Sequence, residues 1–203
     1  MIIETERLIL RKIDPERDFD EWAYSMADEN TVRYLGTKPM SRAEAWRSMA
    51  GAIGHWTIRG YGFFSLENKD TGEWVGRVGP WYPEGWPGPE VGWTISPRHL
   101  RRGYATEAAR AAISYAFDTL GWDSLIHCIL EGNEASMGVA EKVGSSLLRT
   151  EQGLQGITTE NVLIYGQSRE SLRTNGWRTL IMKWIQTDGR QCGPGTKGIS
   201  FSP

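Results

Sequence analysis

The sequence predicts an α/β fold in which helices cover the faces of one mixed β-sheet. Short apolar runs typical of strands alternate along the chain with segments that have helical spacing. Turn sequences join strands into hairpins near both ends of this series, and hairpins combined with interleaved helices favour a mixed sheet. The length of 203 residues suits one domain with a sizeable core.

The first part of the chain is expected to form one strand and two helices. The apolar run at 6–12 contains branched residues and is interpreted as the first strand. Asp14 followed by Pro15 is typical of a helix start, because Asp caps free N–H groups and Pro fits the first turn. Ser41 and Glu44 fit a capping box and predict the start of a second helix.

A hairpin and a further strand follow in the middle of the chain. Strands are expected near 62–68 and 73–81, joined by a turn at 69–72 that contains Asp and Gly. Residues 82–89 hold three prolines and two glycines, a composition typical of a loop. The next strand is expected at 90–95, where a Ser-Pro pair then ends it.

The second part of the chain is expected to hold two more helices among three strands. The helices are predicted at 104–120 and 134–143, and the strands at 124–130, 145–151 and 160–167. Alanines and larger apolar residues give the longer helix one apolar face. Gly121 and Gly144 follow the two helices, as is usual for a residue just beyond a helix C-terminus.

The chain beyond about residue 168 carries a weaker signal. Residues 1–168 are interpreted as the folded domain and 169–203 as a C-terminal extension. Within the extension a helix is expected at 177–186. Residues 187–203 have the Gly-rich composition of a flexible tail.

The composition disfavours several classes of partner. The net charge of -2 and the pI near 6.0 show no basic excess for nucleic acid or an anionic membrane surface. The longest apolar runs are far shorter than the roughly 20 residues that span a bilayer, and residues 1–12 show no secretory signal pattern. Cys128 and Cys192 are expected to be free thiols, so a reducing cytoplasm is predicted. The three histidines lack ligand spacing, and no metal site is expected.

The segment 90–108, EVGWTISPRHLRRGYATEA, carries the clearest chemical signal. A strand ends, a basic loop follows, and a helix then begins at Gly103. The first N–H groups of a helix lack partners within it, and the helix dipole adds positive potential there, so such a terminus binds phosphate. An ordinary basic loop before an Ala-rich helix is the alternative. The segment is neither a Walker loop nor a dinucleotide fingerprint.

Several further motifs stand in a recognisable order. They are ETERLILRK at 4–12, GEWVGRVG at 72–79, the stretch at 89–117 that includes the basic loop, and Asn133 to Ser136 followed by GVAEKVG at 138–144. Together they resemble the Gcn5-related N-acetyltransferase (GNAT) superfamily, and more narrowly the branch with the ribosomal-protein N-terminal acetyltransferases. The resemblance covers about residues 3–168. It implies a mostly antiparallel sheet whose strands splay apart around 90–95 and 124–130.

The resemblance implies that acetyl-CoA is the cosubstrate and that an amine attacks its thioester directly. The residues implied in coenzyme A binding are Ile95, Leu100, Arg101, Arg102, Gly103, Tyr104, Ala105, Thr106 and Asn133. Leu100 and Arg101 depart from the family pattern, which usually has Gln or Arg and Gly at these positions. Asn133 also suits the N-cap of the following helix, and both roles stay open. Glu107, in the first helical turn, is expected to be structural.

Two residues are candidates for proton transfer. Glu90 matches an acidic position of the family and is the candidate base, since a carboxylate among tryptophans is partly desolvated and has a raised pKa. A solvent-exposed glutamate at the strand edge is the alternative. Ser136 is the candidate acid for the thiolate, or a hydrogen-bond partner of it, and helix capping is its alternative.

Aromatic residues near the Gly/Pro-rich loop are candidates for the wall of the acceptor site. They are Trp81, Tyr82, Trp86 and Trp93, and plain core packing is the alternative. His127 and Cys128 lie in an apolar run and are expected in the core. The acceptor is expected to be a protein N-terminus, in an open groove, or a small amine, in a closed site with a counter-charge.

Two other functional classes stay open. A non-catalytic GNAT-fold module that binds acyl-CoA is favoured by the departures at Leu100 and Arg101. A nucleotide-binding protein of another type is disfavoured, because the phosphate-loop lysine and acidic metal ligands are missing. The sequence leaves the oligomeric state open, with a homodimer as one alternative.

Overall fold

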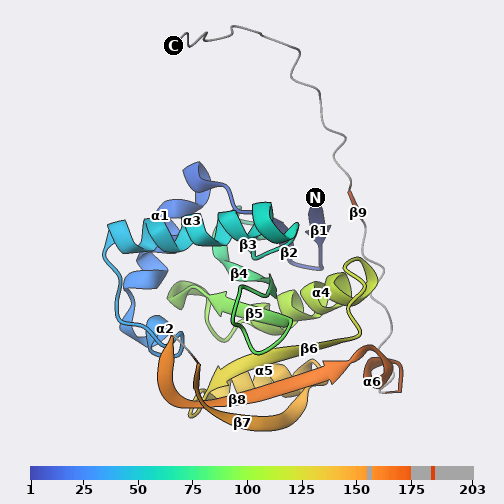
Figure 1. Ribbon diagram of the computed structural model, residues 1–203. Helices are drawn as coiled ribbons and strands as arrows, with labels where there is room; N and C mark the ends of the chain where they lie inside the picture. The colour runs from blue at the N-terminus through green and yellow to red at the C-terminus, as the bar shows by residue number, and fades with distance from the viewer. Residues whose placement is uncertain (155–156, 175–183, 186–203) are drawn as a thin grey trace, which may run out of the picture.

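The computed structural model describes residues 1–154, 157–174 and 184–185. Helices lie on both faces of one sheet, whose strands follow the order β7-β8-β6-β5-β4-β3-β2-β1-β9 (Figure 1). The strands are β1 (Ile2–Glu4), β2 (Leu8–Lys12), β3 (Phe64–Asn68), β4 (Trp74–Trp81), β5 (Glu90–Ile95), β6 (Ser124–Leu130), β7 (Ser146–Leu154), β8 (Thr158–Ser168) and β9 (Trp184–Ile185). All neighbouring strands pair antiparallel except β5 and β6. The predicted mixed, mostly antiparallel sheet is confirmed.

The helices described are α1 (Pro15–Ala27), α2 (Glu29–Arg33), α3 (Arg42–Arg59), α4 (Tyr104–Asp118), α5 (Glu134–Lys142) and α6 (Arg169–Thr174), with a 3-10 turn η1 (Pro97–His99) before α4. Helices α1 and α3 begin at the caps that the sequence predicted. The Asp14 side chain accepts a hydrogen bond from the N–H of Glu16 at the start of α1. Ser41 and Glu44 form the predicted capping box at the start of α3.

Several short elements were not predicted, and one prediction is corrected. Strand β1 has three residues, α2 has five, α6 has six and η1 has three, too few to show a hydrophobic period. Within the helix expected at 177–186, only Trp184 and Ile185 are described, and they pair with β1 as a strand rather than a helix. The rest of that segment and the tail expected at 187–203 lie outside the described residues.

The sheet separates the two largest hydrophobic clusters of the described residues. On one face α1 packs against α3 and β4, in a cluster that includes Trp22, Met49 and Phe63. On the other face α4, whose alanines allow close approach, packs against β2, β4 and β5. The cavity described below lies where the first of these clusters meets β5 and β6.

Strands β5 and β6 diverge immediately after they meet. Their ladder has one register pair, Glu90 with Ile126, so the predicted splay is confirmed. The buried side chain of His127 bridges the two strands beyond this point. Its Nδ1 lies 2.6 Å from the carbonyl oxygen of Val91, and its Nε2 lies 2.9 Å from the hydroxyl oxygen of Ser145. Burial lowers the pKa of His127 to about 4, so the ring is neutral and Nδ1 donates to the carbonyl. His127 is therefore buried, as predicted, and it also lines the cavity described below.

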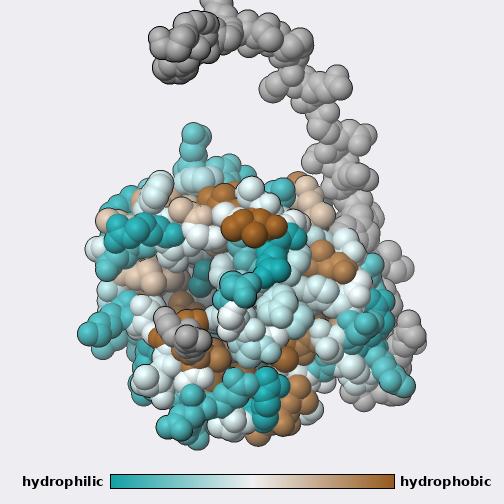
Figure 2. All heavy atoms as spheres, viewed as in Figure 1, coloured by the Kyte–Doolittle hydropathy of each residue, from teal (hydrophilic) through white to brown (hydrophobic). Residues whose placement is uncertain are grey.

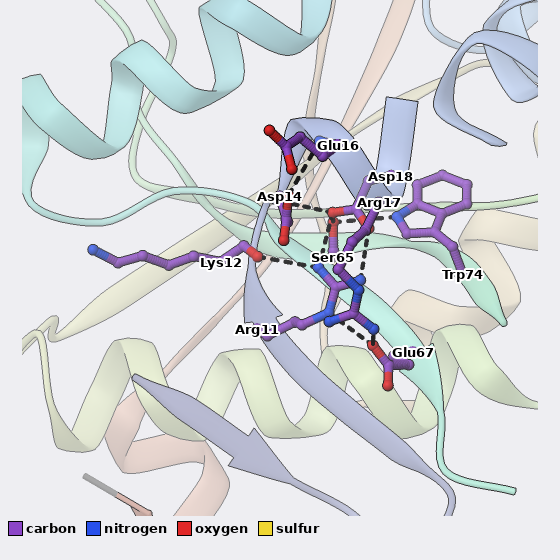
Figure 3. Close-up of polar contacts among 9 residues, drawn as sticks. All are labelled: Arg11, Lys12, Asp14, Glu16, Arg17, Asp18, Ser65, Glu67 and Trp74. Atoms are coloured by element: carbon purple, nitrogen blue, oxygen red, sulfur yellow. Dashed lines mark hydrogen bonds and ion pairs between the residues drawn. The ribbon is translucent and has the colours of Figure 1, made fainter. Parts of the chain in front are cut away.

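A closed polar network fastens α1 to the sheet (Figure 3). Asp18 of α1 is fully buried and accepts hydrogen bonds from both terminal nitrogens of Arg11, at 2.9 and 2.6 Å. Ser65 donates to the same carboxylate at 2.6 Å, and the Nε of Arg11 donates to Glu67 at 2.8 Å. Although burial opposes the charge of Arg11, these two carboxylates raise its pKa. The network satisfies its charges internally.

Candidate active site

A cavity of about 1080 Å³ lies at the divergence of β5 and β6. Its walls come from β4, β5, β6, the start of α5, the segment around α2 and the β7–β8 hairpin. The face in Figure 2 is hollowed between the layer of α1 and α3 and the β7–β8 hairpin, with hydrophobic residues in and around the hollow. The cavity is large enough for a ligand of the size usual in enzyme sites.

Glu90 is buried in this cavity, with 7% of its surface exposed. Its Oε2 accepts a hydrogen bond of 2.6 Å from the indole Nε1 of Trp86, and its Oε1 accepts one of 3.0 Å from the backbone N–H of Cys128. The carboxylate of a β5 residue is thus bonded to the backbone of β6 across the splay. The alternative of a solvent-exposed glutamate is excluded.

Burial raises the pKa of Glu90 to about 7, against the opposing effect of its hydrogen bonds from Cys128 and Trp86. Near neutral pH the group therefore exchanges readily between its charged and neutral forms. A carboxylate with this pKa has the property required of a general base that works near pH 7.

The start of α4 has the features of an anion site. Gly103 is its N-cap, with a φ of 81°, and no side chain caps the helix. The N–H groups of its first turn point out of the helix, and the dipole adds positive potential. Leu100 and Ala105 line the cavity beside this turn. The cavity thus extends from Glu90 to the start of α4.

Other residues predicted for coenzyme A binding are arranged differently. Tyr104 is buried in the core, where its hydroxyl accepts a hydrogen bond of 2.8 Å from Asn68, so only its backbone faces the anion site. Ile95 lines the cavity. Arg101, Arg102, Gly103 and Thr106 do not line it, although all four belong to the loop and first turn at the anion site.

Arg101 departs from the family pattern at a position that strains the backbone. Its φ of 60° is the one positive value of a non-glycine residue in the part of the chain that the structure describes. Side chains disfavour this left-handed region, which glycine enters freely. The positive φ therefore explains why the family usually has glycine at this position. Arg101 adopts the same turn with a strained backbone.

Asn133 and Ser136 lie together at the cavity wall where α5 begins. The Asn133 side chain accepts a hydrogen bond of 3.1 Å from the N–H of Ser136 and so caps α5. Both residues also line the cavity. The capping role of Asn133 is thus present, and the hydroxyl of Ser136 adjoins the same space as Glu90.

Three of the four predicted aromatic residues line the cavity. Trp81 stacks between Phe63 and His55, with ring centroids 4.8 and 4.3 Å away. Trp86 donates its hydrogen bond to Glu90. Trp93 lines the cavity too, although it packs mainly on the cores behind β5 and β6. Tyr82 does not line the cavity: its ring lies under Arg59, 5.3 Å from the guanidinium carbon.

Several cavity residues were missed by the sequence analysis. Tyr34, Arg47, Arg77 and Ile157 line the cavity from four separate segments. A signal for Arg77 exists in the sequence, because it is the one charged residue inside the apolar run at 74–81. Cys128 corrects the core prediction in part, since it is half-buried and lines the cavity.

Glu107 has the structural role that was expected. It accepts hydrogen bonds from the hydroxyl of Thr5 at 2.6 Å and from the backbone N–H of Arg7 at 2.8 Å. It also forms an ion pair of 2.7 Å with the Arg7 guanidinium. These contacts tie the first turn of α4 to the N-terminal segment and hold the anion site in place.

The described residues also bear on membrane spans and metal sites. None of the helices described is long and apolar enough to cross a membrane. Among the same residues, no group of three or more His, Cys, Asp or Glu side chains is placed to hold a metal ion.

The fold and the cavity have counterparts among known acetyltransferases. The chain matches the family described as Acetyltransferase (GNAT) domain over residues 7–146. YoaA of Bacillus subtilis (strain 168), named an uncharacterized N-acetyltransferase, is 30% identical over 145 residues, which are 70% of this chain and 81% of YoaA. The chain therefore belongs to the GNAT family of acetyltransferases.

Solved structures agree with this family. An acetyltransferase from Agrobacterium tumefaciens str. C58 is 28% identical, with a TM-score of 0.72 over 83% of this chain and 95% of that chain. RimL, a ribosomal L7/L12 α-N-protein acetyltransferase solved in complex with coenzyme A, shares the fold at 17% identity, with a TM-score of 0.70 over 84% of this chain and 99% of its own.

Proposed function

We propose that this protein transfers the acetyl group of acetyl-CoA to a primary amine that enters the cavity beside Glu90. One observation carries the proposal: a single cavity joins the uncapped start of α4, the splay between β5 and β6, and the buried carboxylate of Glu90. The diphosphate of the cosubstrate would bind at 100–106, and its arm would run past Ile95 and Asn133. RimL, which shares this fold, was solved in complex with coenzyme A, and this supports coenzyme A as the kind of ligand.

In this proposal Glu90 removes a proton from the attacking amine. A neutral amine is the nucleophile, and it loses a further proton as the amide forms, so a base near the thioester accelerates the step. The Trp86 indole and the Cys128 N–H hold the carboxylate in position. Ser136 is assigned a hydrogen bond to the leaving thiolate. Trp81, Trp86 and Trp93 would form apolar walls that exclude water from the reacting atoms.

The decisive experiment measures acetyl transfer to a panel of amines and peptides by the release of coenzyme A thiol. Glu90→Gln should lower kcat/KM by about 10²-fold or more, while calorimetry shows unchanged acetyl-CoA affinity. Glu141→Gln removes an exposed carboxylate of α5 outside the cavity and serves as the matched control. Equal turnover of the wild type and Glu90→Gln at every pH would remove Glu90 from the mechanism.

The pH profile separates a base from a structural group. The rate should rise as pH passes through about 7, because burial gives Glu90 that pKa and only the carboxylate accepts a proton. The profile should be measured with acceptors whose ammonium groups have different pKa values. If the midpoint of the pH–rate profile reflects Glu90, it does not move when the acceptor is changed. The midpoint should disappear in Glu90→Gln.

A non-catalytic module that binds acyl-CoA is the second candidate, and the strained backbone at Arg101 favours it. Gly103→Trp should abolish acetyl-CoA binding in either case, because the φ of 81° disfavours any side chain and an added Cβ would lie 3.3 Å from a terminal nitrogen of Arg7, so the turn that presents the N–H groups has to shift. Binding by the wild type without transfer to any amine would support the module. Binding that survives in Gly103→Trp would place the cosubstrate elsewhere.

A further inference from the structure

Arg77 faces the acceptor side of the cavity from the middle of β4. It is the register partner of Ser65 on β3 and of Thr94 on β5, and Trp81 is the partner of Glu90 in the same ladder. Arg77 and Trp81 are four residues apart on β4, so their side chains leave the same face of the sheet. Arg77 and Glu90 consequently line one cavity from neighbouring strands.

The Arg77 guanidinium is held by aromatic rings rather than by a carboxylate. Its central carbon lies over the rings of Trp22 and Phe63, at 4.7 and 4.6 Å from their centroids. Its Nε donates a long hydrogen bond of 3.4 Å to the hydroxyl of Thr94. Within residues 1–154, 157–174 and 184–185, no ion pair to Arg77 is formed.

This arrangement leaves hydrogen-bonding capacity directed at the cavity. Cation–π contacts use the faces of a guanidinium, whereas its five N–H donors lie in its plane. Arg77 is half-buried and has no ion pair in the described part of the chain, which is unfavourable for a charge. Burial lowers the pKa of Arg77 to about 10, although the charge of Glu90 raises it. The group remains a cation at neutral pH, and a ligand with two acceptor oxygens would complete its hydrogen bonds.

We propose that the acceptor amine carries a carboxylate, which binds Arg77 while the amine lies beside Glu90. This inference rests on the proposed function and specifies its acceptor. Arg77 and Glu90 are offset by four residues along adjacent strands, about 13 Å between backbone positions along the strand direction. The two side chains span part of this offset. The carboxylate and the amine of the acceptor are therefore separated by several bonds.

Other charges at the cavity agree with an anionic group on the acceptor. Arg47 of α3 and Glu84 of the loop before β5 also line the cavity, and both are exposed to solvent. Apart from Glu90, the charged residues of the lining are two arginines and the exposed Glu84. A polyamine with a second positive charge would meet Arg77 unfavourably, and an amino carboxylate would not.

Two sources supply this chemistry, a free ω-amino acid or a peptide whose first residues include Asp or Glu. The test compares kcat/KM for ω-amino acids of increasing length with their carboxamides, and for peptides that begin with Asp or Glu with their Asn or Gln counterparts. The wild type should prefer the carboxylates by about tenfold or more, as expected for a charge-assisted pair. The set with the larger preference identifies the source.

Variants assign the preference to Arg77. Arg77→Gln should lower kcat/KM for the carboxylates alone, and Arg77→Lys should retain part of the preference. Arg149→Gln removes an exposed arginine of β7 and should keep the whole preference. Thermal unfolding verifies that each variant is folded. Equal use of carboxylate and carboxamide by the wild type, or an undiminished preference in Arg77→Gln, would overturn the inference.

An equilibrium measurement separates this inference from the proposed function. Calorimetry follows the binding of N-acetylated ω-amino acids, which resemble the product, to protein saturated with coenzyme A. Binding that is lost in Arg77→Gln, without transfer to any amine, would uphold the carboxylate site and overturn acetyl transfer. Transfer without a carboxylate preference would uphold acetyl transfer and overturn the carboxylate site. Neither binding nor transfer would overturn both.

Discussion

Arg11 and Arg77 lie in one row across the sheet, since Ser65 is the register partner of both, yet their surroundings are opposite. Helix α1 presents Asp18 to Arg11 and, one turn later, Trp22 to Arg77. Arg11 ends in a closed network of carboxylates, and Arg77 ends beside a cavity. One arginine of this row therefore fastens α1 to the sheet through carboxylates, whereas the other has no ion pair among the described residues and lines the cavity.

The largest effect is expected from opening the closed network. Arg11→Met leaves the fully buried carboxylate of Asp18 without its cation, and we expect the free energy of unfolding to fall by about 3–5 kcal/mol. Urea denaturation measures the loss. Arg17→Met is the control, because Arg17 contacts the same network at Glu67 from a more exposed position and should contribute about 1 kcal/mol or less. Similar losses in both variants would contradict the closed network.

The second effect concerns stability against pH at Glu90. Its pKa is raised from an ordinary 4.5 to about 7, so between these values the folded chain binds a proton that the unfolded chain releases. The stability from this group is present at low pH and is lost as pH rises through about 7. We expect the free energy of unfolding to fall by about 3 kcal/mol across this window.

Denaturation curves of the wild type, Glu90→Gln and the control Glu141→Gln, measured at a series of pH values, test this dependence. The fall in stability should be absent in Glu90→Gln and kept in Glu141→Gln. If the stability of Glu90→Gln varies with pH as that of the wild type does, Glu90 is not the group that makes stability depend on pH.

The third effect comes from relieving the strained turn at the anion site. Arg101→Gly replaces a residue with φ 60° by the one that enters this region freely. The gain should be about 1 kcal/mol or less, because glycine also increases the freedom of the unfolded chain. Thermal unfolding measures it. Arg102→Gly, at a neighbouring position without a positive φ, should instead be destabilising. If both changes alter stability equally, the backbone at Arg101 is not strained.

The smallest change in the free energy of unfolding is expected at Arg77, in contrast to Arg11. Arg77→Met loses two cation–π contacts but removes an unpaired charge from the interior, so the change in unfolding free energy should stay within about 1 kcal/mol. Urea denaturation beside Arg11→Met gives the contrast. A loss at Arg77 as large as that at Arg11 would show that Arg77 is structural and not held open for a ligand.

The sequence predicted the parts of the fold and site that depend on local chemistry. Caps at Asp14 and Ser41 are visible in a few consecutive residues, and both were confirmed. Glu90 was identified from a motif, and its burial followed from the tryptophans close to it in sequence. Three of the four predicted aromatic residues line the cavity for the same reason.

The remainder of the site depends on contacts between distant segments. Tyr34 and Ile157 line the cavity from a turn and a hairpin tip, and neither carries a motif. Arg11 and Arg77 look alike in sequence, and only the position of α1 decides that one receives Asp18 and the other a tryptophan. Such differences arise from tertiary packing, which hydrophobic period and motif spacing do not encode.

The hydrogen bond from the Cys128 N–H to Glu90 gives the splay a further consequence. Because this bond crosses from β6 to β5, the proton affinity of the carboxylate depends on the distance between the two strands. Any cosubstrate arm that widens the gap weakens the bond and favours protonation, since the bond stabilises the charged form. Cosubstrate entry and proton uptake are then thermodynamically coupled, and the heat of binding should vary with the ionisation enthalpy of the buffer.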